Sequence, residues 1–434
     1  MKKAVISILG TIMPPIKGQE RAKYYFSNDL KEKFNLKKER YTNMLPLLLD
    51  NFQDYGEIRN IYTYLSKEKQ TTVLEYELLE YDIVKKGLFI SENIKDEEAN
   101  YSYFLDKYNE LIEEYDRVII DVSHGFRHFP ILAVVNLIIQ NIKNPEKIEY
   151  IFFAKEIKQF QKYEVIDLKE YLELANLSFM LSTFNQNYTV SSNIQFTNPL
   201  YKKVAKELSV FSTHFLSNSF KPLIEGKTIE HIIDNLEELQ KRDTVVNFKN
   251  YIIDIIEHIE DIRQLKYKKE SIKLYELSKI MDDRGYQLNA ITLLFEALGF
   301  YCLESISSLE DIGKRVVTFR GYIEAKKKPL HIYSTYTLVN EARVITKIRN
   351  RFKVSTFINS DALKNSVINY LSCIKNLNEF KQFIEALEAL RNNLAHGNSG
   401  FTLKDVKLIY MKNLHKFEKL VIEENILGKD NALL

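Results

Sequence analysis

The sequence predicts two architectures in one chain: an α/β, Rossmann-like domain at the amino terminus and an all-α remainder. Short apolar runs alternate with amphipathic segments over residues 1 to about 175. After about Leu168, nearly every apolar pattern has helical spacing. Gly and Pro number only 13 and 8 among 434 residues, so few turns interrupt the long elements.

Four short runs rich in Val, Ile, Tyr and Phe have the length and composition of buried strands. They are AVISIL (4–9), EIRNIYTY (57–64), RVIIDV (117–122) and KIEYIFF (147–153). Between the last two, PILAVVNLIIQN (130–141) is too long for a strand, begins with Pro and is apolar nearly all round, which indicates a helix. Without hairpin signals between the runs, this order favours a parallel sheet with helices on both faces.

The rest of the chain is predicted to be helical. Apolar residues recur at helical spacing in four long segments, 168–184, 245–265, 286–306 and 377–396. The segment 185–198 is polar and is the best linker candidate, which places a domain boundary near it.

Composition narrows the class of protein. The chain is 45% hydrophobic and 28% charged with a net charge of +2, which excludes disordered charged tails, collagen-like repeats and histone-like coating of nucleic acid. Cys302 and Cys373 have no Cys or His at metal-ligand spacing, so we expect a reducing compartment and no zinc site. The apolar stretch 129–139 is shorter than the roughly 20 residues of a membrane span. We expect a cytoplasmic protein with no membrane partner.

The loops after two of the predicted strands form the first candidate site. The first strand leads into Gly10 and Thr11, and the third leads into DVSHGFRHFP (121–130). Ligands of parallel sheets bind outside the carboxyl ends of the strands, and the amino terminus of the helix that starts at Pro130 attracts anions. No G-x-G-x-x-G follows the first strand, and the chain contains no P-loop motif, so the expected ligand is a nucleotide of another kind.

A structural interpretation of this loop stays open beside the functional one. Asp121 can cap the loop, Gly125 can supply a positive φ, and Arg127 can be a solvated surface charge. An aromatic residue, Phe126 or Phe129, can stack on a base, and Phe129 can equally anchor the core.

The second candidate site is RNNLAHG (391–397), at the end of a strongly amphipathic helix. Its His can move a proton on or off the ribose 2′-OH or the leaving 5′-oxygen, and its Arg can neutralise charge on the phosphate, so the pair can cleave RNA without metal. The alternative is structural, because Arg and His in a last turn favour the helix dipole and Gly397 is a common residue after a helix end. Residues five apart on a helix differ by about 140° in direction, so one copy of Arg391 and His396 does not automatically face one phosphate. A second copy of the chain, or unwinding at Gly397, can complete the site.

Together these features resemble the CRISPR-associated ribonucleases that join a CARF domain to a HEPN domain. The resemblance rests on ISILGT (6–11), the DVSHGFR loop (121–127), YEVIDLKEYLEL (163–174) and the carboxyl-terminal R-x4-H. It implies a Rossmann-like CARF domain over 1–184, a helical linker region over 185–275 and a helical HEPN ribonuclease domain over 276–434.

The resemblance also implies an activity in type III CRISPR antiviral defence. A cyclic oligoadenylate, cyclic tetra- or hexa-adenylate, binds the CARF domain and activates the HEPN domain to cut single-stranded RNA. The cut leaves 2′,3′-cyclic phosphate and 5′-OH ends and uses no metal ion or other catalytic cofactor. The implied partners are single-stranded RNA, the cyclic oligoadenylate and a second copy of the chain in a homodimer.

The resemblance assigns residues to both sites. The implied catalytic residues are Arg391, Asn392 and His396, and the implied ligand-binding residues are Gly10, Thr11, Ser123, His124, Gly125, Phe126 and Arg127. Two alternatives remain: a non-catalytic nucleotide sensor that regulates another molecule, and a ring nuclease that degrades cyclic oligoadenylate within the CARF domain.

Overall fold

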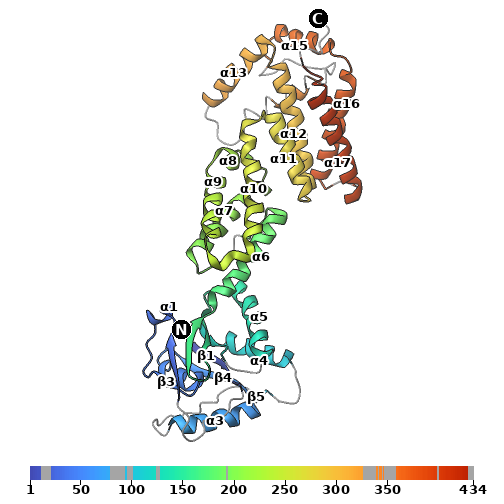
Figure 1. Ribbon diagram of the computed structural model, residues 1–434. Coiled ribbons are helices and arrows are strands. Elements are labelled where there is room, and N and C mark those ends of the chain that lie inside the picture. Colours follow the sequence, from blue (N-terminus) through green and yellow to red (C-terminus); the bar gives the residue numbers. More distant parts are fainter. Residues whose placement is uncertain are drawn as a thin grey trace. The chain divides into compact units, whose positions relative to one another are not determined.

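The computed structural model describes residues 1–10, 21–78, 93–94, 101–123, 128–191, 194–325, 339–340, 342–344, 346, 358–397 and 400–428. The chain forms two compact units (Figure 1). The first comprises Met1–Phe184, Val190–Ser209 and Asp234–Ile252, and the second comprises Asn185–Thr189, Val210–Ile233 and Ile253–Leu434. The units interleave along the sequence, and the division into 1–184, 185–275 and 276–434 stays a prediction.

The first unit is built on a sheet whose eight described strands have the order β3-β2-β8-β7-β6-β1-β4-β5. The four predicted strands are confirmed as β1, β4, β6 and β7, which pair in parallel at the centre of the sheet. The strands are β1 (Lys3–Ile8), β2 (Ala22–Phe26), β3 (Arg40–Tyr41), β4 (Glu57–Thr63), β5 (Asn93–Ile94), β6 (Arg117–Asp121), β7 (Ile148–Lys158) and β8 (Lys162–Asp167).

The sheet differs from the predicted all-parallel arrangement at one side. β8 returns antiparallel to β7, and β3 runs antiparallel to β2. The β7–β8 connection is three residues long and places Phe160 in the left-handed region at φ 51°, where a Gly or Asn is the usual sequence signal. This tight return therefore had no turn signal in the sequence.

Apolar side chains cover both faces of this sheet. Along β1, Val5 lies in one core cluster, whereas Ala4 and Ile6 lie in the other, as the two-residue period of a strand requires. Helix α2 (Met44–Asn51) covers the first face, and α4 (Tyr101–Glu113) and α5 (His128–Lys143) cover the second. The short α1 (Asn28–Lys31) follows β2, and α3 (Tyr64–Leu78) follows β4. The predicted α/β class is confirmed.

After β8 the described chain is helical, as predicted. The polar segment 185–198 is partly helical, because α6 runs on to Asn187 before α7 begins at Pro199. The remaining helices are α6 (Lys169–Asn187), α7 (Pro199–Leu216), α8 (Phe220–Glu225), α9 (Thr228–Gln240), α10 (Lys249–Gln264), α11 (Glu270–Asp283), α12 (Gln287–Ile306), α13 (Glu310–Ala325), α15 (Asp361–Ser372), α16 (Leu377–Ala395) and α17 (Leu403–Phe417).

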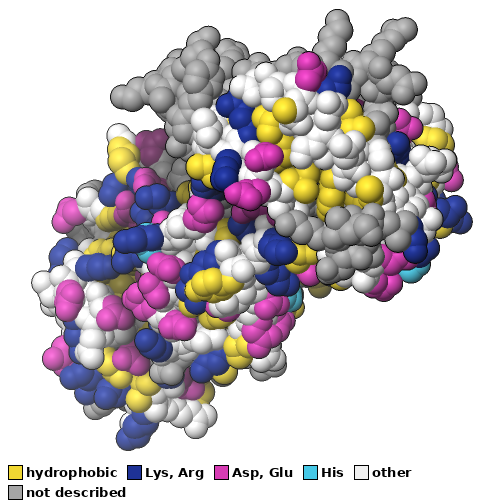
Figure 2. Space-filling view, turned by 90° about the horizontal axis from the view of Figure 1, so that it is seen from above, with side chains coloured by type: hydrophobic (Ala, Val, Ile, Leu, Met, Phe, Trp, Pro, Cys, Tyr) yellow, Lys and Arg dark blue, Asp and Glu magenta, His cyan; other side chains and the backbone are white. Residues whose placement is uncertain are grey.

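Helix α12 is the central helix of the second unit. It packs against α11, α16 and α17, and a fully buried hydrogen bond of 2.8 Å joins the hydroxyls of Ser278 and Tyr410 beside it. By length and composition α12 is apolar enough to cross a membrane, yet 67% of its apolar window is buried, as in a core helix. The surface shown in Figure 2 intersperses Lys and Arg with Asp and Glu, in keeping with the nearly balanced charge.

Candidate functional site

The strand register brings the two predicted loops of the first unit together. Ser7 of β1 pairs with Asp121 of β6, so the chain leaves these adjacent strands through Gly10 and Ser123 on the same edge of the sheet. The Gly10 carbonyl accepts a hydrogen bond of 3.2 Å from Gln70 on α3. The other predicted ligand-binding residues lie outside the described part of the chain: Thr11, His124, Gly125, Phe126 and Arg127.

A wholly buried carboxylate holds this edge. Asp121 accepts a hydrogen bond of 2.7 Å from the Ser7 hydroxyl and one of 3.0 Å from the Ser123 backbone N–H. The capping role considered for Asp121 is therefore confirmed. The Ser123 hydroxyl in turn accepts the Ala154 N–H at 2.8 Å, and its own proton has no acceptor among the described residues. Two hydrogen bonds, one from its backbone N–H and one to its hydroxyl oxygen, thus hold Ser123 in place, and its hydroxyl proton can be donated to a ligand.

Sequence reasoning missed the polar residues beneath Gly10. Gln70 is fully buried, and its carbonyl oxygen accepts a hydrogen bond of 3.1 Å from the buried amide of Asn43. Gln70 belongs to the segment 64–78, in which polar residues occur on every side of the helix. No periodicity distinguishes its inner position, so only the tertiary structure identifies it.

The start of α5 and the position of Phe129 bear on two of the sequence predictions. The helix begins at His128, so Pro130 is its third residue rather than its first. Phe129 is buried and stacks on Phe104 with ring centroids 4.4 Å apart, so it anchors the core. The amino terminus of α5 directly follows residues 124–127, and the helix dipole places partial positive charge at this end.

The second predicted site lies where α16 ends. The half-buried Arg391 donates from Nη1 to the Asn392 side-chain oxygen at 3.0 Å. Its Nε is buried and has no partner among the described residues. A guanidinium has five N–H donors in a planar fork, so the bond to Asn392 uses one of them and orients the group.

His396 is the residue at which the helix stops. Its backbone N–H still bonds to the Asn392 carbonyl at 3.1 Å, whereas Gly397 has a φ of 65° and bonds to the Leu394 carbonyl at 3.2 Å. The expectation that Gly397 is a helix-ending residue is confirmed. This geometry leaves the His396 imidazole exposed. The catalytic role of this turn stays a prediction.

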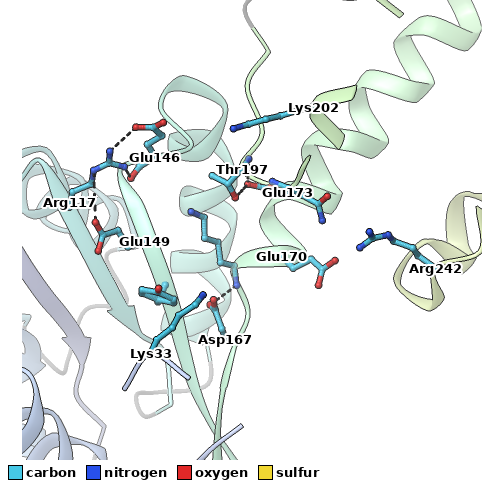
Figure 3. A pocket seen from close by; sticks show the side chains of 13 residues that line it. Lys33, Arg117, Glu146, Glu149, Asp167, Glu170, Glu173, Thr197, Lys202 and Arg242 are labelled. Carbon is cyan, nitrogen blue, oxygen red and sulfur yellow. Dashed lines mark hydrogen bonds and ion pairs between the residues drawn. The ribbon is translucent and has the colours of Figure 1, made fainter. Parts of the chain in front are cut away.

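A cavity of about 760 Å³ lies at the opposite edge of the sheet (Figure 3). It is lined where β6 and β7 begin and where α6 starts, away from Gly10 and Ser123. Five basic and five acidic side chains line it, and Arg117 pairs with Glu146 at 2.7 Å. Burial raises the pKa of Asp167 and lowers that of Lys169. Because the basic and acidic side chains are equal in number, the cavity has no preference for an anionic or a cationic ligand.

Three comparisons place the chain among known proteins. No family model matches it. It is 21% identical over 337 residues to the CRISPR-associated protein MJ1674 of Methanocaldococcus jannaschii; the match covers 74% of this chain and 50% of that protein, so the chain spans about half the length of this curated relative. The solved structure of Enterococcus italicus Csm6 bound to cyclic hexa-2′-fluoro-hexa-dAMP aligns over 99% of this chain and 98% of that one, at 13% identity and a TM-score of 0.29. The predicted resemblance to CRISPR-associated proteins is confirmed by the curated relative.

Proposed function

From this similarity to a CRISPR-associated protein, we propose that the chain is an RNA endonuclease of CRISPR antiviral defence, activated by a cyclic oligoadenylate. One observation carries the proposal. At the end of α16 the exposed imidazole of His396 lies five residues along the chain from Arg391, whose guanidinium is held by Asn392. An imidazole and an oriented guanidinium are the groups that RNA transesterification needs.

The chemistry uses this turn in both copies of the chain and the RNA itself. The ribose 2′-oxygen attacks the adjacent phosphorus and forms a 2′-O–P bond while the P–O5′ bond breaks. In the proposed dimer, His396 of one copy takes the proton of the 2′-OH and His396 of the other copy gives one to the leaving 5′-oxygen, while Arg391 stabilises the charge on the phosphate. The products carry a 2′,3′-cyclic phosphate and a 5′-OH, and a metal ion has no part in the proposal.

The activator is proposed to bind at the edge formed by β1 and β6. Gly10 and Ser123 lie side by side there, and Ser123 offers a hydroxyl proton. The amino terminus of α5 adds partial positive charge for phosphate groups. Cyclic tetra- or hexa-adenylate is the proposed ligand, with further contacts from Thr11, His124, Gly125, Phe126 and Arg127.

A homodimer is part of the proposal, and an exposed apolar stripe on α5 supports it. Ile131, Val135, Ile139 and Ile142 are 65%, 52%, 52% and 55% exposed, and their spacing puts them on one face of the helix. Exposed apolar side chains aligned in this way favour burial against a partner. Because α5 follows residues 124–127, a second copy packed on this stripe brings both activator loops together. The protein is proposed to act in the cytoplasm, in keeping with Cys302 and Cys373, which form no disulfide bond in the described part of the chain.

The cleavage proposal is tested with labelled single-stranded RNA in EDTA, with and without cyclic tetra-adenylate or cyclic hexa-adenylate. The wild type is expected to cut only with one of these rings. His396→Ala and Arg391→Ala are expected to lose cutting while activator binding is unchanged. His415→Ala is the matched control, because His415 is 79% exposed on the neighbouring α17 and pairs with Glu418 at 3.7 Å. Full activity of His396→Ala would exclude this site, and activator binding without any cutting by the wild type would favour the non-catalytic sensor.

A separate variant tests the activator site. Arg127→Ala is expected to raise the activator concentration needed for half-maximal cutting, with unchanged products at saturation, because it removes a cation from the proposed phosphate contacts. Analysis of the ring by mass spectrometry reveals whether the sensor unit also degrades it. An unchanged activation curve would place the activator elsewhere.

A further inference from the structure

We propose that a groove beside β2 in the first unit is a docking surface for single-stranded RNA. The groove has a volume of about 450 Å³, within the range of about 300–1,000 Å³ typical of ligand sites. One wall is β2 and the other is the segment 31–39. A hydrogen bond of 2.8 Å from the Tyr24 N–H to the Glu39 carbonyl joins the two walls.

Charge is the first argument for a nucleic acid. Four lysines line the groove, Lys23, Lys31, Lys38 and Lys162, against one acidic residue, Glu39. Lys23 pairs with Glu39 at 2.8 Å, whereas Lys31 and Lys162 have no acidic partner among the described residues. Positive charge gathered along a groove attracts a phosphate backbone through counterion release. The cavity of Figure 3 has equal numbers of basic and acidic side chains and so lacks this preference.

An aromatic ring among these lysines is the second argument. Tyr25 is half-buried in the groove, and the ammonium groups of Lys31 and Lys162 lie 5.4 and 4.9 Å from its ring centroid. Both lysines are exposed, so their contacts with the ring are weak. An unpaired base stacks on such a ring more strongly than an exposed ammonium does, and the displaced ammonium groups are then free to meet the phosphates. Bases of a duplex are already stacked and cannot do this, so the groove favours a single strand.

The choice of RNA over DNA comes from acceptors in the same groove. The exposed Asn35 carries an amide oxygen, and Glu39 carries a carboxylate that Lys23 keeps ionised by lowering its pKa. Either oxygen can accept a hydrogen bond from a ribose 2′-OH, which DNA lacks. The groove belongs to the first unit, whereas Arg391 and His396 belong to the second, and the proposal does not rest on the proposed cleavage.

Fluorescence anisotropy with a labelled ten-nucleotide single-stranded RNA tests the proposal in the full chain. All variants carry His396→Ala so that the probe is not consumed. The double variant Lys31→Gln/Lys162→Gln is expected to bind about tenfold more weakly and to lower the slope of log K against log salt by about 1.4, or about 0.7 for each phosphate that no longer meets a lysine. The matched control is Lys221→Gln/Lys314→Gln, which removes two lysines that are 82% and 71% exposed elsewhere.

Substitutions of Tyr25 separate stacking from charge. Tyr25→Leu is expected to weaken binding about tenfold, and Tyr25→Phe is expected to restore it, because only the ring is needed for stacking. Circular dichroism identifies variants that fail to fold. Equal affinity of the double variant and its lysine control would overturn the proposal. Equal affinity for single-stranded DNA, or for duplex RNA, would overturn the assignment to single-stranded RNA. These readouts stay informative even if the chain cuts no RNA.

Discussion

The side-chain oxygen of Asn392 lies 3.0 Å from Nη1 of its neighbour Arg391, and this hydrogen bond holds the guanidinium at the end of α16. Adjacent residues on a helix point about 100° apart, so the contact requires the long Arg391 side chain to fold back toward Asn392. Asn392 is therefore a positioning residue in the proposed site, whereas Arg391 and His396 act on the phosphate and on the proton.

Asn392→Ala is expected to lower kcat for activated RNA cutting about tenfold, because the released guanidinium no longer has one orientation. The expected KM changes less than kcat, since the positive charge itself remains. The control is Asn393→Ala, an exposed neighbour of the same type. Steady-state cleavage at saturating activator measures both constants. Equal kcat for the two variants would show that the hydrogen bond does not matter.

Gly397→Ala is expected to lower the free energy of unfolding by about 1 kcal/mol and to reduce RNA cutting, because a side chain disfavours the φ of 65° that ends α16 beside His396. The position has nothing within 4 Å of an added Cβ, so the effect is one of backbone conformation alone. Gly400→Ala, with equally open space and no positive φ, is the control. Thermal unfolding and cleavage rates are measured together. Indistinguishable Tm and rate for the two variants would contradict this account.

Val135→Glu and Ile139→Glu are expected to weaken self-association, because each puts a charge into the exposed apolar stripe on α5. Sedimentation velocity over a range of protein concentrations measures the dimer. Thr72→Glu introduces the same charge at an exposed position of α3 and is expected to leave the sedimentation coefficient unchanged. A wild type that stays monomeric at all concentrations would exclude the stripe as a dimer surface.

Asp121→Ala is expected to lower the local stability of β1 and β6 by about 3 kcal/mol, because it removes the buried acceptor of both the Ser7 hydroxyl and the Ser123 N–H. Ser7→Ala removes one of these bonds and keeps the other, so its expected effect is about half as large. Hydrogen exchange of the β1 and β6 amides measures both. A larger loss of stability in Ser7→Ala than in Asp121→Ala would show that the carboxylate is not the central acceptor.

Strong apolar runs predicted the central strands of the sheet. The strands β2, β3 and β8 at one side of the sheet have weaker apolar patterns and were not predicted. In β2 the inward Tyr24 and Phe26 alternate with the outward Lys23 and Tyr25, a pattern of only five residues. In β8 only Val165 is buried, and the strand follows β7 without a turn signal. A half-buried strand contributes few apolar residues to the sequence, so its partner decides whether it forms a strand at all.

By itself the sequence determined the order of α/β and helical elements, the carboxyl-edge position of the first site, and Arg391, Asn392 and His396 as a group at a helix end. These follow from periodicity and from neighbours within one turn, which are local properties of the chain. Only the tertiary structure decided that Ser7 meets Asp121 across 114 residues and that Gln70 supports Gly10. It also decided that β2 and segment 31–39 enclose a basic groove with Tyr25. Such contacts depend on the order of the strands in the sheet and on the paths of the loops between them. Many weak packing interactions between distant segments together stabilise one such arrangement, and no single stretch of sequence contains them.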